Sequence, residues 1–493
     1  AVPFFSKLLE QPSTPLFPCI SSIYFSSSLR FPLPKTILTG SSNSQIMSIT
    51  PLVLFSFILS LLFLSIKLKK EIMCCIIALV FFREGNLITM TALRNKLNYS
   101  HTRAACCLAY VTQSVAAMFM PLLFVRFGSE FGLSMDRLTA LVTVTFFTQI
   151  FVDAAAPLIV QKTGYRALAV IAAAFSFCGI AGLSFMADLV PGAFWGLFIC
   201  TVLYAIGSGL IEVLITPIVD SCPTDKKAGS MAFVHSAYCA GCALVVLLST
   251  AYFSVFGIEN WRYLALLFSA VPLLAAVSFC AVPIVTPEEV RERGSVKDMF
   301  KNPLFWIFGV VMICAGASEL SMSQWASAFA EAGLGVSKTT GDLLGPCAFA
   351  VLMFIGRIFY GKISDRVDII KVLFACSALC VVSYLLASFA QNPILALMGC
   401  CLCGLAVAPM WPATFSLCGK YMPNISSAGF AVYALLGDVG CTGGPTAVGI
   451  ISGDSTNISK GLSVALVFPV LLAVCLAAAK MIFSKKQKKT CTN

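Results

Sequence analysis

The sequence predicts an all-α polytopic membrane protein with twelve transmembrane helices arranged as two six-helix bundles. Two observations predict this fold class. The chain is 59% hydrophobic and only 11% charged, which leaves more apolar surface than a water-soluble fold could keep out of water. From about residue 104 to 483 it reads as consecutive apolar stretches, each near the twenty residues that a helix needs to cross a bilayer. In lipid the backbone polar groups must be satisfied within helices or closed barrels, and stretches of this length indicate helices.

The first 89 residues differ from the rest of the chain. Residues 1–50 are rich in Ser, Pro and Phe without a helical period, residues 51–66 could cross once, and the apolar run 72–82 is too short to cross back. Arg83-Glu84-Gly85 can be encoded by purines alone, as a bacterial ribosome-binding site would be, shortly before Met90. We therefore expect residues 1–89 to be translated upstream sequence. The alternative is an N-terminal extension with one apolar segment.

The twelve predicted spans fall into two equal groups. Residues 90–285 are expected to form the N-terminal bundle, and residues 303–493 the C-terminal bundle with a basic tail. The polar, charged loop 286–302 divides them and is expected to be a cytoplasmic linker. Because apolar runs closed by short polar turns indicate membrane helices, the spans are expected at 104–125, 138–160, 167–186, 193–215, 229–255, 263–285, 304–327, 341–361, 369–389, 393–417, 428–451 and 461–483.

The loop cations predict the orientation. Placing the N-terminus in the cytoplasm puts most loop lysines and arginines, and the basic tail at 485–489, on one side. Because loop cations set orientation, both termini are expected in the cytoplasm and the protein in the plasma (inner) membrane of a bacterium. The net charge of +11 is spread over many short loops, which indicates a lipid bilayer as partner and argues against nucleic acid. The opposite side receives only these cations: Arg126, Arg137, Arg262, Lys338 and Lys460.

The composition argues against an enzyme and against a metal protein. Most of the 22 cysteines lie inside apolar spans, where Cys serves as a small packing residue. Cys400 and Cys403 have no second Cys or His pair beside them, so a metal site is not expected. With two histidines in all and no nucleophile triad or nucleotide-binding loop, we expect no catalysis and no cofactor.

Two cytoplasmic turns share one outline, after the second and the eighth predicted spans. Residues 356–366 read GRIFYGKISDR, a pattern in which glycine allows close helix approach and the final Asp-Arg pair can lock the turn by charge-assisted hydrogen bonds. Residues 157–166 form a degraded copy, with Pro157 and Gln161 in place of the glycine and the acid, and Asp153 one turn earlier as a substitute. The residues expected to act in gating are Gly361, Asp365, Arg366, Arg357, Asp153, Gly164 and Arg166.

This repeated turn in a six-plus-six protein resembles the major facilitator superfamily, from about residue 104 onward. The resemblance implies the major facilitator fold, in which helices 1, 4, 7 and 10 line a central cavity. Span 4 carries GSGLIEVLITP at 207–217, which resembles the fucose:proton symporter group of sugar carriers. That likeness implies that Glu212 takes part in proton-coupled sugar transport. The stretches HSAY at 235–238 and PMWPATF at 409–415 are similar in kind.

One departure limits the resemblance. The acid that the group carries near the proline of helix 1 is absent, because Ala116 and Ala117 stand there before Pro121. Neither fucose as substrate nor the group's coupling scheme therefore transfers intact.

Ionisable residues at membrane depth are candidates for function, because a charge there costs about 2.5 to 3.5 kcal/mol on insertion scales. Glu212 and Glu319 lie on expected cavity helices, where a carboxylate can bind a proton, or sodium, on one side and release it on the other. Asp438 stands between glycines, which transporters use at binding and hinge sites. His235 could relay a proton, although packing is the commoner role. Arg357 is expected to pair with Asp365 or a helix end.

Four further residues are expected to contact the solute. Amide groups bind hydroxyls, and an aromatic ring covers the apolar face of a sugar. A Trp near a span end can instead be an interface anchor. The expected contacts are Gln113, Gln324, Trp325 and Trp411.

These residues favour a secondary active transporter of a small polar solute, a sugar or related metabolite, that works by rocking of two halves with proton or sodium coupling and functions as a monomer. The alternative within transport is an organic-anion or carboxylate transporter or exchanger, which needs a cavity cation such as Arg357. The alternative of another class is a non-transporting sensor or scaffold built on a transporter fold.

Overall fold

The computed structural model describes residues 97–223, 227–285, 299–364, 366–422 and 427–491. All of them belong to one compact unit. The predictions for residues 1–89, for Asp365 and for most of the linker 286–302 concern residues outside these ranges.

The structure confirms the twelve predicted spans and extends most of them. The first six, which we call the N-half, are α6 (Tyr99–Met118) continued by η2 (Pro121–Leu123) and α7 (Phe124–Phe131); α8 (Met135–Thr163); α9 (Tyr165–Gly182); α11 (Ala193–Asp220), preceded by the short α10 (Met186–Leu189); α12 (Lys227–Phe256); and α13 (Trp261–Ala281), preceded by η3 (Ile258–Asn260).

The last six spans form what we call the C-half. They are α15 (Pro303–Ala328) continued by η4 (Phe329–Gly333); α16 (Lys338–Asp342), η5 (Leu343–Cys347) and α17 (Ala348–Ile363); α18 (Ile369–Phe389); α19 (Pro393–Val407) with α20 (Met410–Tyr421); α21 (Ser427–Ser452); and η6 (Ser455–Asn457), α22 (Ile458–Ala465) and α23 (Val467–Cys491).

Prolines explain why three spans are interrupted. Pro121 begins η2 within the first span, Pro346 lies in the wide π-turn η5, and Pro409 precedes α20. Proline has no backbone N–H and its ring clashes with the preceding turn, so a helix kinks or breaks there.

Residues that favour a helix start stand at the beginning of α15. Asn302 accepts a hydrogen bond from the Leu304 N–H at 3.1 Å, with Pro303 at the first helical position, the preferred chemistry of a helix start.

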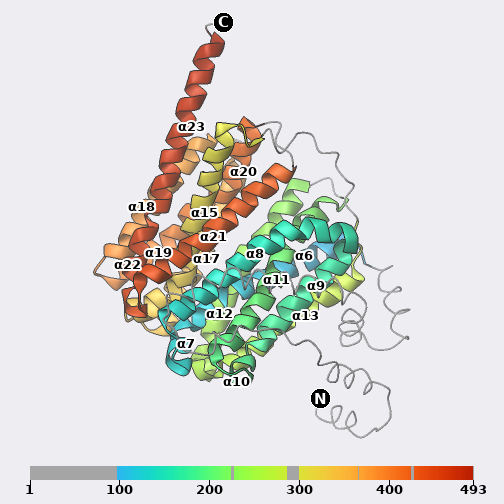
Figure 1. Ribbon diagram of the computed structural model, residues 1–493, viewed down its shortest axis with the longest axis vertical. Helices are drawn as coiled ribbons and strands as arrows, with labels where there is room; N and C mark the ends of the chain where they lie inside the picture. The colour runs from blue at the N-terminus through green and yellow to red at the C-terminus, as the bar shows by residue number, and fades with distance from the viewer. Residues whose placement is uncertain (1–96, 224–226, 286–298, 365, 423–426, 492–493) are drawn as a thin grey trace, which may run out of the picture. The chain divides into compact units, whose positions relative to one another are not determined.

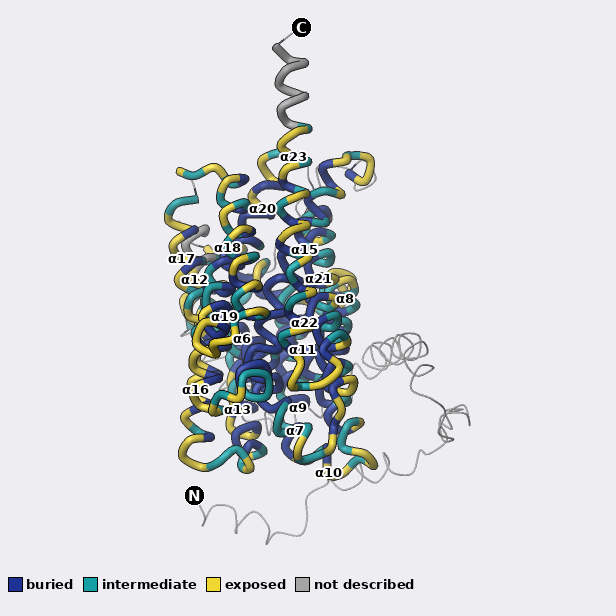
Figure 2. The backbone as a smooth tube through the Cα atoms, turned by 90° about the vertical axis from the view of Figure 1, so that its left-hand side faces the viewer, coloured by how far each residue is buried: buried dark blue, intermediate teal, exposed yellow. Residues whose placement is uncertain are grey.

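The helices of each half lie mainly against one another. In Figure 1 the earlier helices (blue to green) and the later helices (yellow to red) form two groups within the unit. Contact between the halves is made chiefly by α8 against α21 and by α12 against α17. In Figure 2 buried backbone lies in the interior and exposed backbone outside. Large apolar side chains such as Leu267, Phe389 and Val474 are exposed, as expected for a surface solvated by lipid.

The two ends of the bundle have different loops. We call the end at which the odd-numbered spans begin the cationic end, because the sequence places most loop cations there, and the other the far end. Gly132 and Gly453 close helices at the far end, and Gly164 turns between α8 and α9 at the cationic end. Gly164 has φ +78°, a conformation that L side chains rarely adopt, so the structure explains this glycine as a turn residue.

Candidate functional site

An acid from the N-half lies between three helices. The Gln113 amide on α6 donates to Glu212 Oε2 on α11 at 2.8 Å. Glycines bring α11 close to its neighbours. A side chain at Gly207 would collide with Ser176 of α9, and a Cβ at Gly209 would lie 3.0 Å from Asp153 Oδ1 of α8. Small residues therefore let α11 pack closely against α9 and α8, on the helix that carries Glu212.

An acid and an arginine from the C-half form a second pair. Glu319 on α15 is 6% exposed, and its Oε2 lies 3.5 Å from Arg357 Nη2 on α17. Arg357 was expected to pair with Asp365 or a helix end; here it pairs with Glu319, and Asp365 lies outside the described residues. Arg357 lies well before the end of α17, and a buried carboxylate without a cation would be costly. Arg357 Nε has no hydrogen-bond partner.

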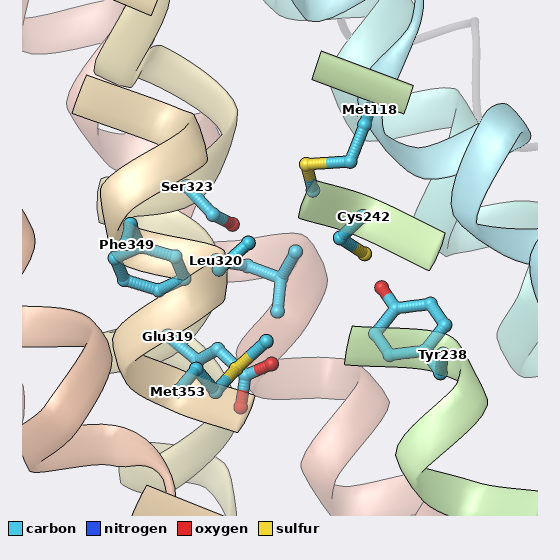
Figure 3. Close-up of a pocket in the computed structure, with 9 residues that line it drawn as sticks. Met118, Tyr238, Cys242, Glu319, Leu320, Ser323, Phe349 and Met353 are labelled. Carbon is cyan, nitrogen blue, oxygen red and sulfur yellow. The ribbon is translucent and has the colours of Figure 1, made fainter. Parts of the chain in front are cut away.

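A small pocket lies between the halves beside Glu319. Figure 3 shows the Glu319 carboxylate and the Tyr238 hydroxyl at its edge. Among the predicted site residues, Glu319 lines this pocket. Sequence reasoning missed Ser323 and Met353, and it quoted Tyr238 only as part of a motif. The run of serines before Trp325 was an available signal for Ser323. The lining residues are Met118, Tyr238, Cys242, Glu319, Leu320, Ser323, Phe349, Ala350 and Met353.

The two pairs lie close enough for their acids to interact. Glu212 and Glu319 interact electrostatically across the halves. The structure thus brings together Gln113, Glu212, Glu319 and Arg357 from α6, α11, α15 and α17. Among the described residues, no group of three or more His, Cys, Asp or Glu side chains could hold a metal ion.

His235 is held by two neighbours. The Tyr110 hydroxyl lies 3.2 Å from its Nδ1 and the Thr216 hydroxyl 3.3 Å from its Nε2. The Tyr110 and His235 ring centroids are 5.1 Å apart. Both ring nitrogens therefore have partners on neighbouring helices, which is sufficient for a packing role.

Gln324 and Trp325 bind backbone carbonyls. The Gln324 amide donates to the Ala117 carbonyl at 3.1 Å, across the halves. The fully buried Trp325 donates from Nε1 to the Pro445 carbonyl at 2.9 Å, with its ring centroid 5.3 Å from that of Phe124. In this conformation both side chains join helices, and neither lines the small pocket.

Trp411 of α20 packs against α21, the helix that carries Asp438. The Trp411 ring covers Gly437, where any side chain would collide with it. Asp438 is 7% exposed, and its Oδ2 has no hydrogen-bond partner. Asp153 on α8 likewise has a buried, unpartnered Oδ1.

The predicted gating turns are described in part. Arg166 Nη1 donates to the Phe279 carbonyl at 2.7 Å and to the Cys280 carbonyl at 3.1 Å, so it binds the end of α13 within the N-half. Gly361 has open space where a Cβ would be, so close helix approach does not require glycine there. The exposed Arg366 closes the turn through its backbone N–H to the Ile363 carbonyl at 2.8 Å.

Comparison with known proteins gives one family over most of the chain. The sequence matches the family described as the Major Facilitator Superfamily over residues 104–445. An uncharacterised MFS-type transporter of Yersinia pestis is 24% identical over 213 residues, which are 42% of this chain and 54% of the relative. A glucose/mannose transporter of Bacillus subtilis (strain 168) is 38% identical over 92 residues, 17% of this chain and 22% of the relative. The matches thus span about half or less of these relatives.

Solved structures share the fold at low sequence identity. A D-xylose-proton symporter superposes with a TM-score of 0.65 at 14% identity, covering 77% of this chain and 96% of the symporter. A nucleoside transporter gives 0.63 at 13%, covering 77% and 99%. The fucose:proton symporter of E. coli gives 0.54 at 14%, covering 76% and 98%. At these identities the likeness concerns the fold.

Proposed function

The chain belongs to the Major Facilitator Superfamily and is a membrane transporter, not an enzyme, and from that premise we propose that it moves a small hydroxylated solute of the sugar class by alternating access, coupled to protons. One observation carries the proposal. Each half contributes an acid at membrane depth with one polar partner, the half-buried Glu212 with Gln113 and the buried Glu319 with Arg357, and the two acids lie close enough to interact.

The arrangement supports coupling through Glu319. While it is ionised, Glu319 holds the Arg357 guanidinium, and a proton on Glu319 weakens that attraction. Because the carboxylate also lines the small pocket, a solute there and a proton on the acid act on one group. A solute and an ion that share a group can each alter the other's affinity. Sodium remains the alternative coupling ion.

The side chains that line the pocket favour a hydroxylated solute, which the halves would have to separate to admit, because the pocket itself has room for about one water molecule. The hydroxyls of Tyr238 and Ser323 can each donate and accept a hydrogen bond, and Phe349 adds an aromatic ring. Such a mixture suits a ligand with hydroxyls on an apolar carbon frame. The names of the matched sugar and nucleoside transporters agree with this solute class.

The loop cations support a plasma-membrane protein with the cationic end in the cytoplasm. On that orientation, substrate taken up from outside is released at the cationic end.

The position of Arg357 favours a second candidate, an organic-anion or carboxylate transporter. The side chain is 24% exposed and lies with Glu319 at membrane depth, not at the cytoplasmic rim. Protonation of Glu319 would free the guanidinium to bind a substrate carboxylate, for which its fork of donors is suited.

Proteoliposome uptake tests these proposals. Wild-type protein is given a panel of labelled hexoses, pentoses, nucleosides and small carboxylates under an imposed pH or sodium gradient, beside Glu212→Gln and Glu319→Gln. The control is Glu259→Gln, which removes an exposed acid of η3 at the far end. We expect sugar uptake driven by the pH gradient, loss of that drive in Glu319→Gln and Glu212→Gln, and wild-type behaviour of the control.

Other outcomes overturn the assignment. Uptake that responds to neither gradient and survives both substitutions rejects coupling by these acids. Uptake of carboxylates alone, abolished by Arg357→Met, establishes the second candidate. If uptake is driven by a sodium gradient and not by a pH gradient, the assignment of the site stands and the coupling ion is sodium.

A further inference from the structure

The two halves meet along α8 and α21, and the register of this helix pair brings two acids side by side. The Thr143 and Thr446 hydroxyls are 2.7 Å apart. The helices run in opposite directions, because one belongs to an even and the other to an odd span. A helix rises about 1.5 Å per residue. Asp153 therefore lies roughly 15 Å from Thr143, and Asp438 roughly 12 Å from Thr446, both measured toward the cationic end. The two acids are thus at nearly the same level.

Packing within each half leaves room for both acids beside the α8–α21 contact. On α21, Gly437 lies under the Trp411 ring and Gly440 against the Ile313 carbonyl of α15. Those faces are used inside the C-half, while Asp438 shares a face with Thr446, two turns away. On the other side, Gly209 of α11 leaves room for the Asp153 carboxylate.

At this register Asp153 and Asp438 stand at nearly the same level on two packed helices, close enough for their carboxyl groups to interact. Each also has a buried oxygen without a partner. Among the residues that the structure describes, neither forms an ion pair with a lysine or arginine. The other titratable groups that interact with Asp438 are Glu212 of α11, which also interacts with Asp153, and Cys441 of α21.

We propose that Asp153 and Asp438 bind one proton between them and that this shared proton joins the two halves at the α8–α21 interface. A hydrogen bond between two carboxyl groups requires one of them to be protonated. The proton comes from water, and its O–H donates to the carboxylate of the other acid. Its return to water leaves two like charges in contact, which repel. Proton loss therefore favours separation of α8 from α21.

The proton is a better ligand than a metal cation here. Hard cations such as Ca²⁺ and Mg²⁺ take about six or more oxygen ligands, and this pair supplies few. Neither acid lines the small pocket, so this site goes beyond the proposed function and does not depend on coupling by Glu212 or Glu319.

Hydrogen–deuterium exchange on the full chain in lipid nanodiscs tests the proposal. Exchange in 143–153 and 438–446, corrected for the intrinsic rate, is compared at mildly acidic and mildly alkaline pH. We expect a several-fold rise in the wild type as pH increases. Asp153→Asn and Asp438→Asn should lose this response and keep exchange low, because the new amide donates to the remaining carboxylate without a proton. Asp136→Asn, at the exposed start of α8, should respond like the wild type.

A second measurement guards against misfolded variants. In infrared spectra of the wild type, the C=O band of a protonated carboxylic acid should decrease as pH rises, and each single Asn variant should lack that component. An unchanged band in both variants, or an unchanged pH response of exchange, overturns the proposal. Sodium in place of choline at fixed pH should have no effect. Protection by sodium would assign a metal cation and reject the proton. None of these readouts requires transport, so they can succeed where the uptake experiment fails.

Discussion

The far end and the cationic end of the bundle are held together differently. At the far end, hydrogen bonds cross between the halves: Lys338 Nζ to the Leu122 carbonyl at 2.6 Å, Gln324 to Ala117 at 3.1 Å, and Ser254 with Thr339 at 3.3 Å. At the cationic end, bonds such as that from the Thr102 hydroxyl to the Pro283 carbonyl, 2.6 Å, stay within one half.

This difference indicates which way the transporter is closed. The hydrogen bonds named at the cationic end, from Thr102 and from Arg166, stay within the N-half. Rocking can separate the halves there without breaking them, once the proton that we propose Asp153 and Asp438 share is lost. If the cationic end faces the cytoplasm, the conformation is the one closed toward the outside. The difference between the two ends can be tested by removing single contacts.

Lys338 should give the largest effect. Its ammonium group joins the Leu122 carbonyl of the N-half to Asp342, 3.0 Å away and 1% exposed, and to Ser327 at 2.8 Å. In Lys338→Met the buried Asp342 loses its cation, which costs about 3 to 5 kcal/mol of stability. We expect a lower melting temperature in nanodiscs and faster deuterium exchange at the far end.

Two comparisons make this prediction specific. Lys460→Met removes an exposed lysine at the same end and should be neutral. Adding Asp342→Asn to Lys338→Met should restore part of the lost stability, because contacting groups couple. Additive losses in the double variant would argue against the ion pair.

Gln324 should give an intermediate effect. Gln324→Ala removes one hydrogen bond across the halves, worth about 1 kcal/mol. Thr102→Val removes one side-chain bond to a carbonyl within the N-half at the other end. We expect similar losses of stability, with faster exchange at the far end only in Gln324→Ala. Equal exchange changes at the far end in both variants would contradict the comparison.

The smallest effect should come from titrating Asp454, which lies in a loop at the far end. We expect it to change deuterium exchange only near that loop. Hydrogen bonds from the Thr456 side chain and backbone, and from Asn457, lower the pKa of the Asp454 carboxyl. Because the pKa is lower in the folded state, the ionised carboxyl stabilises the fold fully at pH values above the ordinary Asp pKa. This stabilisation is lost as the pH falls through the lowered pKa. Exchange in η6 should rise under acid in the wild type. Asp454→Asn should show no such dependence.

The spans were predictable because the length of an apolar run follows directly from bilayer thickness. The interruptions were less predictable. Proline removes a backbone donor, but Pro121, Pro346 and Pro409 stand at interruptions while Pro157, Pro217, Pro272 and Pro445 lie inside continuous helices. The six-plus-six grouping of contacts follows the charged loop at 286–302, although the domain boundaries themselves stay a prediction.

The partners of the site residues were not predictable. Glu212 and Glu319 were found because a charge at membrane depth is costly, but the pairing of Arg357 depends on the rotation of α17 against α15. Gln324 and Trp325 were taken as solute contacts, and the structure gives them backbone carbonyls as partners. Periodicity shows which residues share a helix face, and it contains no information on which helix lies opposite.

The wide turns on either side of Lys338 have a pharmacological consequence. The π-turn η4 precedes α16 and the π-turn η5 follows it, so this five-residue helix is joined to its neighbours by segments without the regular α-helical bonding pattern. If the far end faces outward, as we propose, a nanobody bound at the exposed Thr339 and Thr340 of α16 would hold this helix still from outside the cell. Such an inhibitor would arrest the transport cycle without competing with the solute.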